Sequence, residues 1–170
     1  MDKFRTGWYL IYTKPKHEKK VFQQLRESRI DSYLPTKKTL RSWRDRRKFV
    51  DEPLFPSYVF VYLNCMQSYY AGIDTEGALY YVRNGKEVAR VSDAVVSNIR
   101  LLQDKGEALE VSHERFQPGR RMVIRNGPLT GLDCEVVRCD NKSKLLVRVE
   151  LLQRGLLLSI AEEDVAGCYE

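Results

Sequence analysis

Apolar positions in the first hundred residues switch between strand-like and helix-like spacing. Gly7 to Thr13 is almost uniformly apolar and predicts a buried strand. Pro15 then opens a predicted helix that runs to about Ser28, with Val21, Phe22 and Leu25 on its apolar side. A hairpin is predicted over Thr36 to Asp51, with its tip near Arg44 to Arg47, and a short helix is predicted from a cap at Asn64 through Ile73. A strand-turn-strand over Leu79 to Val91 should turn at Asn84-Gly85. The last helix of this part should be capped by Ser92, with Val95, Ile99 and Leu102 on one face.

The segment Glu52-Pro53-Leu54-Phe55-Pro56-Ser57-Tyr58-Val59-Phe60-Val61 joins a stiff corner with two prolines to a strand that is apolar on both faces. Strand periodicity sends Tyr58, Phe60 and Tyr62 to one face and the aliphatic residues between them to the other. Helices cover one such face in a small mixed domain, so the aromatic face has to meet another layer, another domain or another protein. A strand simply buried on both sides is the alternative. Tyrosine is favoured at protein interfaces, because its ring is apolar while its hydroxyl tolerates water.

Beyond residue 106 the helical spacing disappears, and the stretch 107–116 is predicted to be a linker. Short strand candidates follow over Arg120 to Arg125, Cys134 to Cys139, Lys144 to Leu151, Leu156 to Ile160, and Asp164-Val165. About fifty residues of short antiparallel strands predict a small barrel, since closure removes exposed edges. We therefore expect an α+β chain with domains over 1–106 and 117–170.

Composition narrows the class of protein. Of the 170 residues, 43% are hydrophobic, which excludes a disordered chain, and 31% are charged, which excludes an integral membrane protein. No apolar run reaches the roughly 20 residues that span a bilayer, and no signal peptide is evident at the start of the chain. A cytoplasmic protein without a membrane partner is expected.

Positive charge is concentrated at the start of the chain. The first 50 residues hold 15 basic and 5 acidic residues, whereas residues 117–170 hold 8 of each. On the predicted first helix, Lys16, Lys20, Gln23 and Gln24 share the face opposite the apolar side. Such a basic block suits a polyanion such as nucleic acid, and a solvated surface is the alternative.

Catalytic and metal-binding patterns are weak. Cys65, Cys134, Cys139 and Cys168 are scattered without a Cys-x-x-Cys pair or a histidine cluster, so free buried thiols are expected rather than a zinc site. The two histidines, His17 and His113, fall on an exposed helix position and in the linker. With no nucleophile, phosphate-loop or paired-carboxylate pattern, we expect no enzyme, no metal and no cofactor.

Three local patterns resemble one family. They are the WYLIYTKPKHEKKV strand and helix near the N-terminus, the EPLFPSYVFV corner, and a C-terminal stretch that runs from Pro118-Gly119-Arg120 to Gly127-Pro128-Leu129-Thr130-Gly131. Together they resemble the NusG family of transcription elongation factors. Within that family, the corner resembles the operon-specialised paralogues typified by RfaH, and the overall pattern resembles the UpxY type, antiterminators of surface-polysaccharide operons.

The resemblance implies an N-terminal NusG-type α/β sandwich, in which helices pack on an antiparallel sheet, and a C-terminal SH3-like β-barrel. The barrel would carry the KOW motif, with Gly127, Pro128 and Gly131 as its signature. Relatives imply a ribosomal protein or Rho as the partner of that barrel.

The resemblance also implies sites. The clamp helices of RNA polymerase would bind Tyr12, Phe55, Tyr58 and Phe60, and the polymerase gate loop would contact the region of Ser68, Tyr69 and Tyr70. The non-template DNA strand would contact Lys14, Lys16, Lys20 and Gln24. The function implied is transcription antitermination: the protein would hold the clamp closed and suppress pausing or termination.

Two alternatives stay open at this point. The chain is alternatively an RNA-binding or ribosome-associated module, with the basic hairpin as its RNA surface. In the C-terminal domain, Leu145-Leu146, Leu151-Leu152 and Leu156-Leu157-Leu158 favour a helix, as in the stored helical hairpin of RfaH, whereas Val147 and Val149 favour a strand. We expect the strand form, because the Arg154-Gly155 turn suits a β-hairpin.

Overall fold

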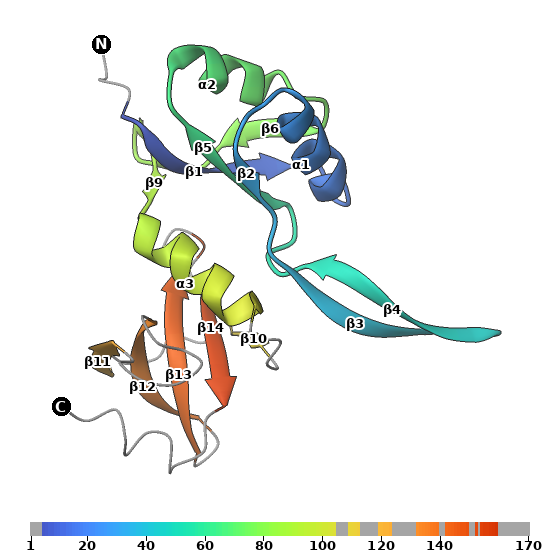
Figure 1. Ribbon diagram of the computed structural model, residues 1–170, viewed down its shortest axis with the longest axis vertical. Coiled ribbons are helices and arrows are strands. Elements are labelled where there is room, and N and C mark those ends of the chain that lie inside the picture. The colour runs from blue at the N-terminus through green and yellow to red at the C-terminus, as the bar shows by residue number, and fades with distance from the viewer. Residues whose placement is uncertain are drawn as a thin grey trace. The chain divides into compact units, whose positions relative to one another are not determined.

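The computed structural model describes residues 5–104, 109–112, 119–123, 132–139, 142–149, 152 and 154–159 (Figure 1). The chain divides into two compact units, Met1–Asp93 and Ala94–Glu170. None of the helices within the described ranges has the length and apolar character needed to cross a membrane.

The first unit is built on one antiparallel sheet. Its strands are β1 (Gly7–Thr13), β2 (Ser32–Tyr33), β5 (Tyr58–Leu63), β6 (Ala78–Tyr81) and β9 (Arg90–Val91), in the order β2-β5-β1-β6, with β9 also paired to β1. β1 pairs with β5 in an unbroken register from Gly7 opposite Leu63 to Tyr12 opposite Tyr58. Because side chains of opposed residues point to the same side, this register sorts both strands into one aromatic and one largely aliphatic face.

Helices α1 (Glu18–Glu27) and α2 (Met66–Ile73) contribute to the core on the aliphatic face of the sheet. The buried core side chains are Tyr9, Ile11, Val21, Leu25, Ile30, Leu34, Val59, Val61, Leu63 and Tyr81. Phe22 of α1 and Tyr69 and Ile73 of α2 pack against this core. The prediction that Val59, Val61 and Leu63 lie on the helix-covered face is confirmed.

The first helix is shorter than the sequence predicts. It begins at Glu18 rather than Pro15, because residues 14–17 form a turn in which the His17 amide donates to the Lys14 carbonyl at 3.1 Å. Its C-terminal end is closed by Arg29 in a left-handed conformation, with φ of 57°, and by a hydrogen bond from the Ile30 amide to the Leu25 carbonyl.

Two predicted turn and cap positions are wrong by one residue. The N-cap of α2 is Cys65 rather than Asn64, and its sulfur accepts the Ser68 amide at 3.4 Å, which lowers the pKa of the thiol. The hairpin between β7 (Arg83–Asn84) and β8 (Glu87–Val88) turns at Gly85-Lys86, with Gly85 at φ of 63°. In both cases the predicted position is an asparagine next to the observed one, and asparagine favours caps and turns.

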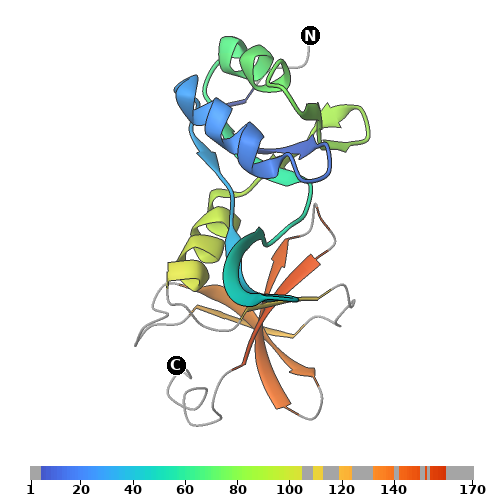
Figure 2. The same ribbon diagram turned by 90° about the vertical axis from the view of Figure 1, so that its right-hand side faces the viewer.

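A long two-stranded ribbon leaves the body of the first unit (Figure 1). It consists of β3 (Thr36–Trp43) and β4 (Arg46–Pro53), which pair from Thr36 opposite Pro53 to Trp43 opposite Arg46. Figure 2 shows that the ribbon is strongly curled. The predicted hairpin is therefore confirmed, and its tip is Arg44-Asp45.

The second unit contains α3 (Asp93–Asp104), apart from its first residue, and a five-stranded antiparallel sheet. The strands are β10 (Leu109–Ser112), β11 (Arg120–Val123), β12 (Asp133–Cys139), β13 (Lys142–Val149) and β14 (Arg154–Ser159), in the order β10-β14-β13-β12-β11. The expected strand form of residues 144–160 thus holds for the part that the structure describes. Gly127, Pro128, Gly131 and the candidate strand Asp164-Val165 lie outside the described residues.

Two features of this unit differ from the sequence prediction. β10 falls inside the stretch 107–116 that is predicted to be a linker, and it pairs with β14 from Leu109 opposite Leu158. Helix α3, predicted as part of the first domain, groups with the second unit. Its buried Asn98 exchanges two hydrogen bonds with the backbone of Asp133: the amide nitrogen donates to the carbonyl at 2.9 Å, and the amide oxygen accepts the N–H at 3.3 Å.

A partly buried ion pair ties three segments of the second unit together. Arg148 of β13 donates to both carboxylate oxygens of Glu135 on β12, at 2.8 and 3.0 Å. The amide of Gly119 donates to the same carboxylate at 3.0 Å. Gly119 has to be glycine, because a Cβ there would come within 2.2 Å of the Val136 carbonyl oxygen. The Arg148 guanidinium, more than any other group, holds the pKa of Glu135 below its usual range.

Replacing Glu135 with Gln is expected to lower the free energy of unfolding by about 1–3 kcal/mol at neutral pH, because the charged acceptor is lost. The pKa of Glu135 is lower in the folded state, so its contribution is present above the usual carboxyl pKa and is lost as the pH falls through the depressed value. Urea unfolding of wild type and Glu135→Gln across the acid range measures this. The control is Arg121→Gln, which removes the exposed pair of Arg121 with Asp133 and should change stability by less than about 1 kcal/mol. A constant difference between wild type and Glu135→Gln at every pH would contradict the assignment.

Candidate functional site

Aromatic side chains form three rows across one face of the first sheet. Trp8 and Tyr62 meet edge to face at 5.4 Å, and Tyr12 and Tyr58 meet in the same way at 5.2 Å. Between these rows, Leu10 lies opposite Phe60. Two rings from neighbouring strands extend these rows: Tyr80 of β6 stacks on Tyr12 at 5.0 Å, and Tyr33 of β2 contacts Phe60 at 6.0 Å. We call these residues the aromatic face.

The residues predicted to bind the polymerase clamp all belong to or adjoin this face, with unequal exposure. Tyr12 and Tyr58 are half-buried, whereas Phe55 and Phe60 are buried, with 1% and 0% of their surface exposed. The Phe55 ring packs edge to face on Phe60 at 6.2 Å. Phe60 lies on the same side of the sheet as Tyr58, so these residues of one surface differ in exposure: Tyr12 and Tyr58 are the more accessible pair and Phe55 and Phe60 the covered pair.

Sequence reasoning missed Tyr80. Its side chain is 54% exposed, and its stacking on Tyr12 extends the aromatic face to the edge strand β6. The signal was available in the sequence, because Tyr80 and the buried Tyr81 are adjacent strand residues and so point to opposite faces of the sheet.

The corner before β5 is a tight turn. The Tyr58 amide donates to the Phe55 carbonyl at 3.2 Å, Pro56 occupies the second position, and Ser57 has φ of 66°. These are the features of a type II turn, in which the third position usually requires glycine. A serine there is strained by about 1–2 kcal/mol, so other contacts have to hold the corner in place.

Glu18 is the anchor of this corner. Its carboxylate is buried, with 6% of the residue exposed, and its Oε1 accepts the Ser57 amide at 2.7 Å. The Ser57 carbonyl in turn accepts the Thr13 amide of β1 at 2.8 Å. The first turn of α1, the end of β1 and the proline corner are thereby fixed to one another, which places the aromatic face next to the basic residues of α1.

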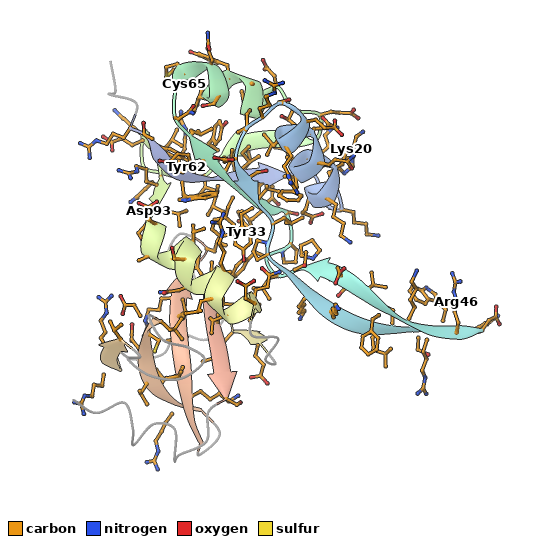
Figure 3. All side chains as sticks on the ribbon, viewed as in Figure 1. Lys20, Tyr33, Arg46, Tyr62, Cys65 and Asp93 are labelled. Carbon is orange, nitrogen blue, oxygen red and sulfur yellow. The ribbon has the colours of Figure 1, made fainter. Side chains whose placement is uncertain are left out.

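The residues predicted to contact DNA lie around the start of α1. Lys14 and Lys16 are exposed in the turn before the helix, Lys20 is exposed on it, and Gln24 is half-buried one turn further on. Lys16 is a second strained residue, with φ of 63° directly after Pro15. Lys20, labelled in Figure 3, donates to Glu76 at 2.6 Å. That hydrogen bond is the main cause that lowers the pKa of Glu76, so Lys20 already has an anionic partner.

The predicted gate-loop residues lie in helix α2 and are used differently from one another. Ser68 closes the helix cap, since its hydroxyl donates to the Cys65 carbonyl at 2.7 Å. Tyr69 stacks on Tyr81 at 4.6 Å, and the Tyr81 hydroxyl donates to the Tyr69 carbonyl at 2.8 Å. Only Tyr70 of the three is largely exposed, at 58%. Within the described ranges, no three His, Cys, Asp or Glu side chains gather as a metal ion would require.

Comparison with known proteins adds an independent observation. The NusG family model, described as a transcription termination factor, matches residues 6–100. A solved structure described as the domain interaction in Thermotoga maritima NusG is 19% identical, covers 91% of this chain and 94% of that chain, and superposes with a TM-score of 0.50. A crystal structure of the MjSpt4:Spt5 complex in conformation B is 13% identical, covers 89% of this chain and 91% of that chain, and has a TM-score of 0.35.

We predict that Glu18→Ala lowers the free energy of unfolding by about 1–3 kcal/mol, because it leaves the Ser57 amide without its acceptor. Glu18→Gln keeps an acceptor oxygen and should lose markedly less. Chemical denaturation of both variants measures the difference. Equal losses for Ala and Gln would contradict this reason, because Gln keeps both the size of the side chain and an acceptor oxygen; the negative charge of Glu18 would then be what matters at this position.

Proposed function

Because this chain belongs to the NusG family of transcription factors, we propose that it binds RNA polymerase through its aromatic face and acts on elongation without catalysing a reaction. The observation that carries the proposal is the pair Tyr12 and Tyr58: two half-buried rings in contact across the β1 and β5 register, on a sheet whose other face forms the core. Rigid tyrosines that are partly covered by their neighbours are typical of residues that dominate binding energy at protein interfaces.

We further propose that the protein favours elongation through pause or termination sites, by holding the polymerase clamp helices closed. Tyr12, Tyr58 and Tyr80 would contact the clamp first, since they are the more accessible rings, and the buried Phe55 and Phe60 would complete the same surface. Tyr70 would supply any contact to the gate loop, since Ser68 and Tyr69 are engaged in the cap and the core.

Operon specialisation of the RfaH and UpxY kind is a finer proposal. Two features support it: the EPLFPSYVFV corner, and the cluster of Lys14, Lys16, Lys20 and Gln24 beside the aromatic face. A protein bound at the clamp would hold these side chains near the unpaired non-template strand, where lysines attract phosphates and glutamine bonds to a base edge. The second unit would form the KOW barrel and recruit a ribosomal protein or Rho.

The competing function is an RNA-binding or ribosome-associated module. The basic β3–β4 ribbon favours this function, because its positive charges and exposed aromatic side chains could bind nucleic acid without polymerase being present. The two functions differ in one observable: the module would bind free structured RNA tightly, whereas the elongation factor would bind polymerase in the absence of RNA.

Tyr12→Ala and Tyr58→Ala are each expected to weaken polymerase binding by about 30-fold, which corresponds to about 2 kcal/mol for a hot-spot residue. Binding to core polymerase by the full chain measures this. Phe55 is unsuitable for the test, because truncating a buried aromatic costs about 3–5 kcal/mol and would confuse unfolding with loss of contact.

Phe49→Ala is the matched control for these two variants. Phe49 is an aromatic residue of the same unit, 66% exposed on the ribbon and outside the aromatic face. Urea unfolding checks that all three variants remain folded. Folded Tyr12→Ala and Tyr58→Ala proteins that bind polymerase as tightly as Phe49→Ala would refute the proposal.

For the DNA contact, we predict that Glu76→Gln strengthens the interaction, because it releases Lys20 from its ion pair. In an elongation complex with an exposed non-template strand, the salt dependence of binding should steepen by nearly one phosphate contact. Glu76→Gln combined with Lys20→Gln should abolish the gain. Glu27→Gln is the control, since it makes the same charge change on α1 next to Gln23. An equal effect of Glu27→Gln and Glu76→Gln would mean that only net charge matters.

A further inference from the structure

The β3–β4 ribbon separates its charges along its length. In the half next to the sheet, two basic residues face two acidic residues across the strands, Lys37 opposite Glu52 and Lys38 opposite Asp51. Residues 40–49, the distal half, hold five basic residues and one acidic residue. The base of the ribbon is thus charge-balanced, and the whole excess of four positive charges lies in its distal half.

The two faces of the distal half differ. The strand register places Arg41, Trp43, Arg46 and Lys48 on one face, which we call the cationic face. The opposite face carries Leu40 opposite Phe49, and Ser42 opposite Arg47. Trp43 is 52% exposed, and Figure 3 labels Arg46 toward the free end of the ribbon.

The cationic face is unfavourable for the ribbon on its own. Arg41 and Lys48 are directly opposed, and like charges in that position destabilise a strand pair. Arg41 reaches back along the ribbon to Glu52, to which its Nε donates at 2.7 Å. Among the described residues, the structure shows no ion pair for Arg46 or Lys48. Bound anions on this face would remove the repulsion.

We propose that the distal half of the ribbon binds double-stranded DNA, with its cationic face laid in the major groove and Arg46 and Lys48 against the phosphates. A two-stranded β-ribbon has the width that the major groove of B-form DNA admits. Trp43 adds apolar surface against sugars and thymine methyl groups. This site is distinct from the single-strand contact assigned to α1 and does not require polymerase.

The geometry favours duplex DNA over the other nucleic acids. The major groove of A-form RNA is too deep and narrow for side chains on a ribbon to read. Single strands bind by stacking successive bases on several rings, whereas Trp43 is the single aromatic ring on the cationic face. Phe49 lies on the other face, where it cannot extend a stack begun at Trp43.

The test measures binding of the full chain to a labelled DNA duplex of mixed sequence, to one of its strands alone, and to an RNA duplex of the same sequence. Salt is varied between about 50 and 200 mM. Arg46→Gln with Lys48→Gln removes two charges from the cationic face. Lys38→Gln with Arg47→Gln removes two charges from the opposite face and is the matched control. All four positions are exposed, so neither double variant disturbs the core.

We expect the DNA duplex to bind tightest. The Arg46 and Lys48 double variant should reduce the slope of log affinity against log salt by about two, and the control should leave it unchanged. Trp43→Ala should weaken binding without changing the slope. Equal slopes for the two double variants would overturn the assignment of the face, and equal or tighter binding of the single strand or the RNA duplex would overturn the choice of duplex DNA. Absence of DNA binding would overturn the proposal as a whole, while leaving the polymerase contact to be judged by its own variants.

Discussion

The pairing of β1 with β5 decides which side chains of the first unit form its core and which form its aromatic face. The register from Gly7–Leu63 to Tyr12–Tyr58 places Ile11, Val59 and Val61 against the helices and leaves Tyr12 and Tyr58 in contact on the other side. A slip of one residue would exchange the two faces of a strand. A slipped register would bury tyrosine hydroxyls in the core in place of aliphatic groups, and this free-energy cost stabilises the observed register. The same register creates the surface proposed to bind polymerase.

Two strained turns connect this sheet to its surroundings. Each places a proline before a residue with positive φ, Pro15 before Lys16 and Pro56 before Ser57, where glycine would be relaxed. Strain of this kind persists only where neighbouring contacts over-determine the backbone. At Ser57 the contacts are the Glu18 carboxylate on its amide and the Thr13 amide on its carbonyl. At Lys16 they are the His17 amide on the Lys14 carbonyl and the Lys14 amide on the Gly77 carbonyl. The turns thus fix Lys16 beside the aromatic face, so a partner would meet both surfaces already in position, at little cost in ordering.

Local periodicity predicted much of this structure, and long-range contacts account for what it missed. The alternation of Tyr58 to Leu63, the ribbon and the strands β13 and β14 follow from neighbouring residues alone. The late start of α1 does not, because it depends on the Lys14–His17 turn and on Glu18 reaching Ser57. β10 was missed because a four-residue edge strand is defined by its partner β14. The burial of Phe55 was missed for the same reason: local spacing does not predict a contact between rings from different segments, such as that of Phe55 with Phe60. The placement of Tyr12, Tyr58 and the basic residues near them could be anticipated, but the unequal exposure of the residues on this surface could not.

The structure also resolves the basic block at the start of the chain into regions of different electrostatic strength. Around α1, Lys20 is compensated by Glu76, so its phosphate affinity is reduced by an existing pair. At the base of the ribbon, Glu52 and Asp51 balance Lys37 and Lys38 in number, and Glu52 is also ion-paired with Arg41. In its distal half, five basic residues surround Asp45 alone. Since uncompensated charges release most counterions when they meet a polyanion, we expect the ribbon to supply more of the first unit's long-range attraction for nucleic acid than α1, whose proposed contact would act at short range after the aromatic face has docked.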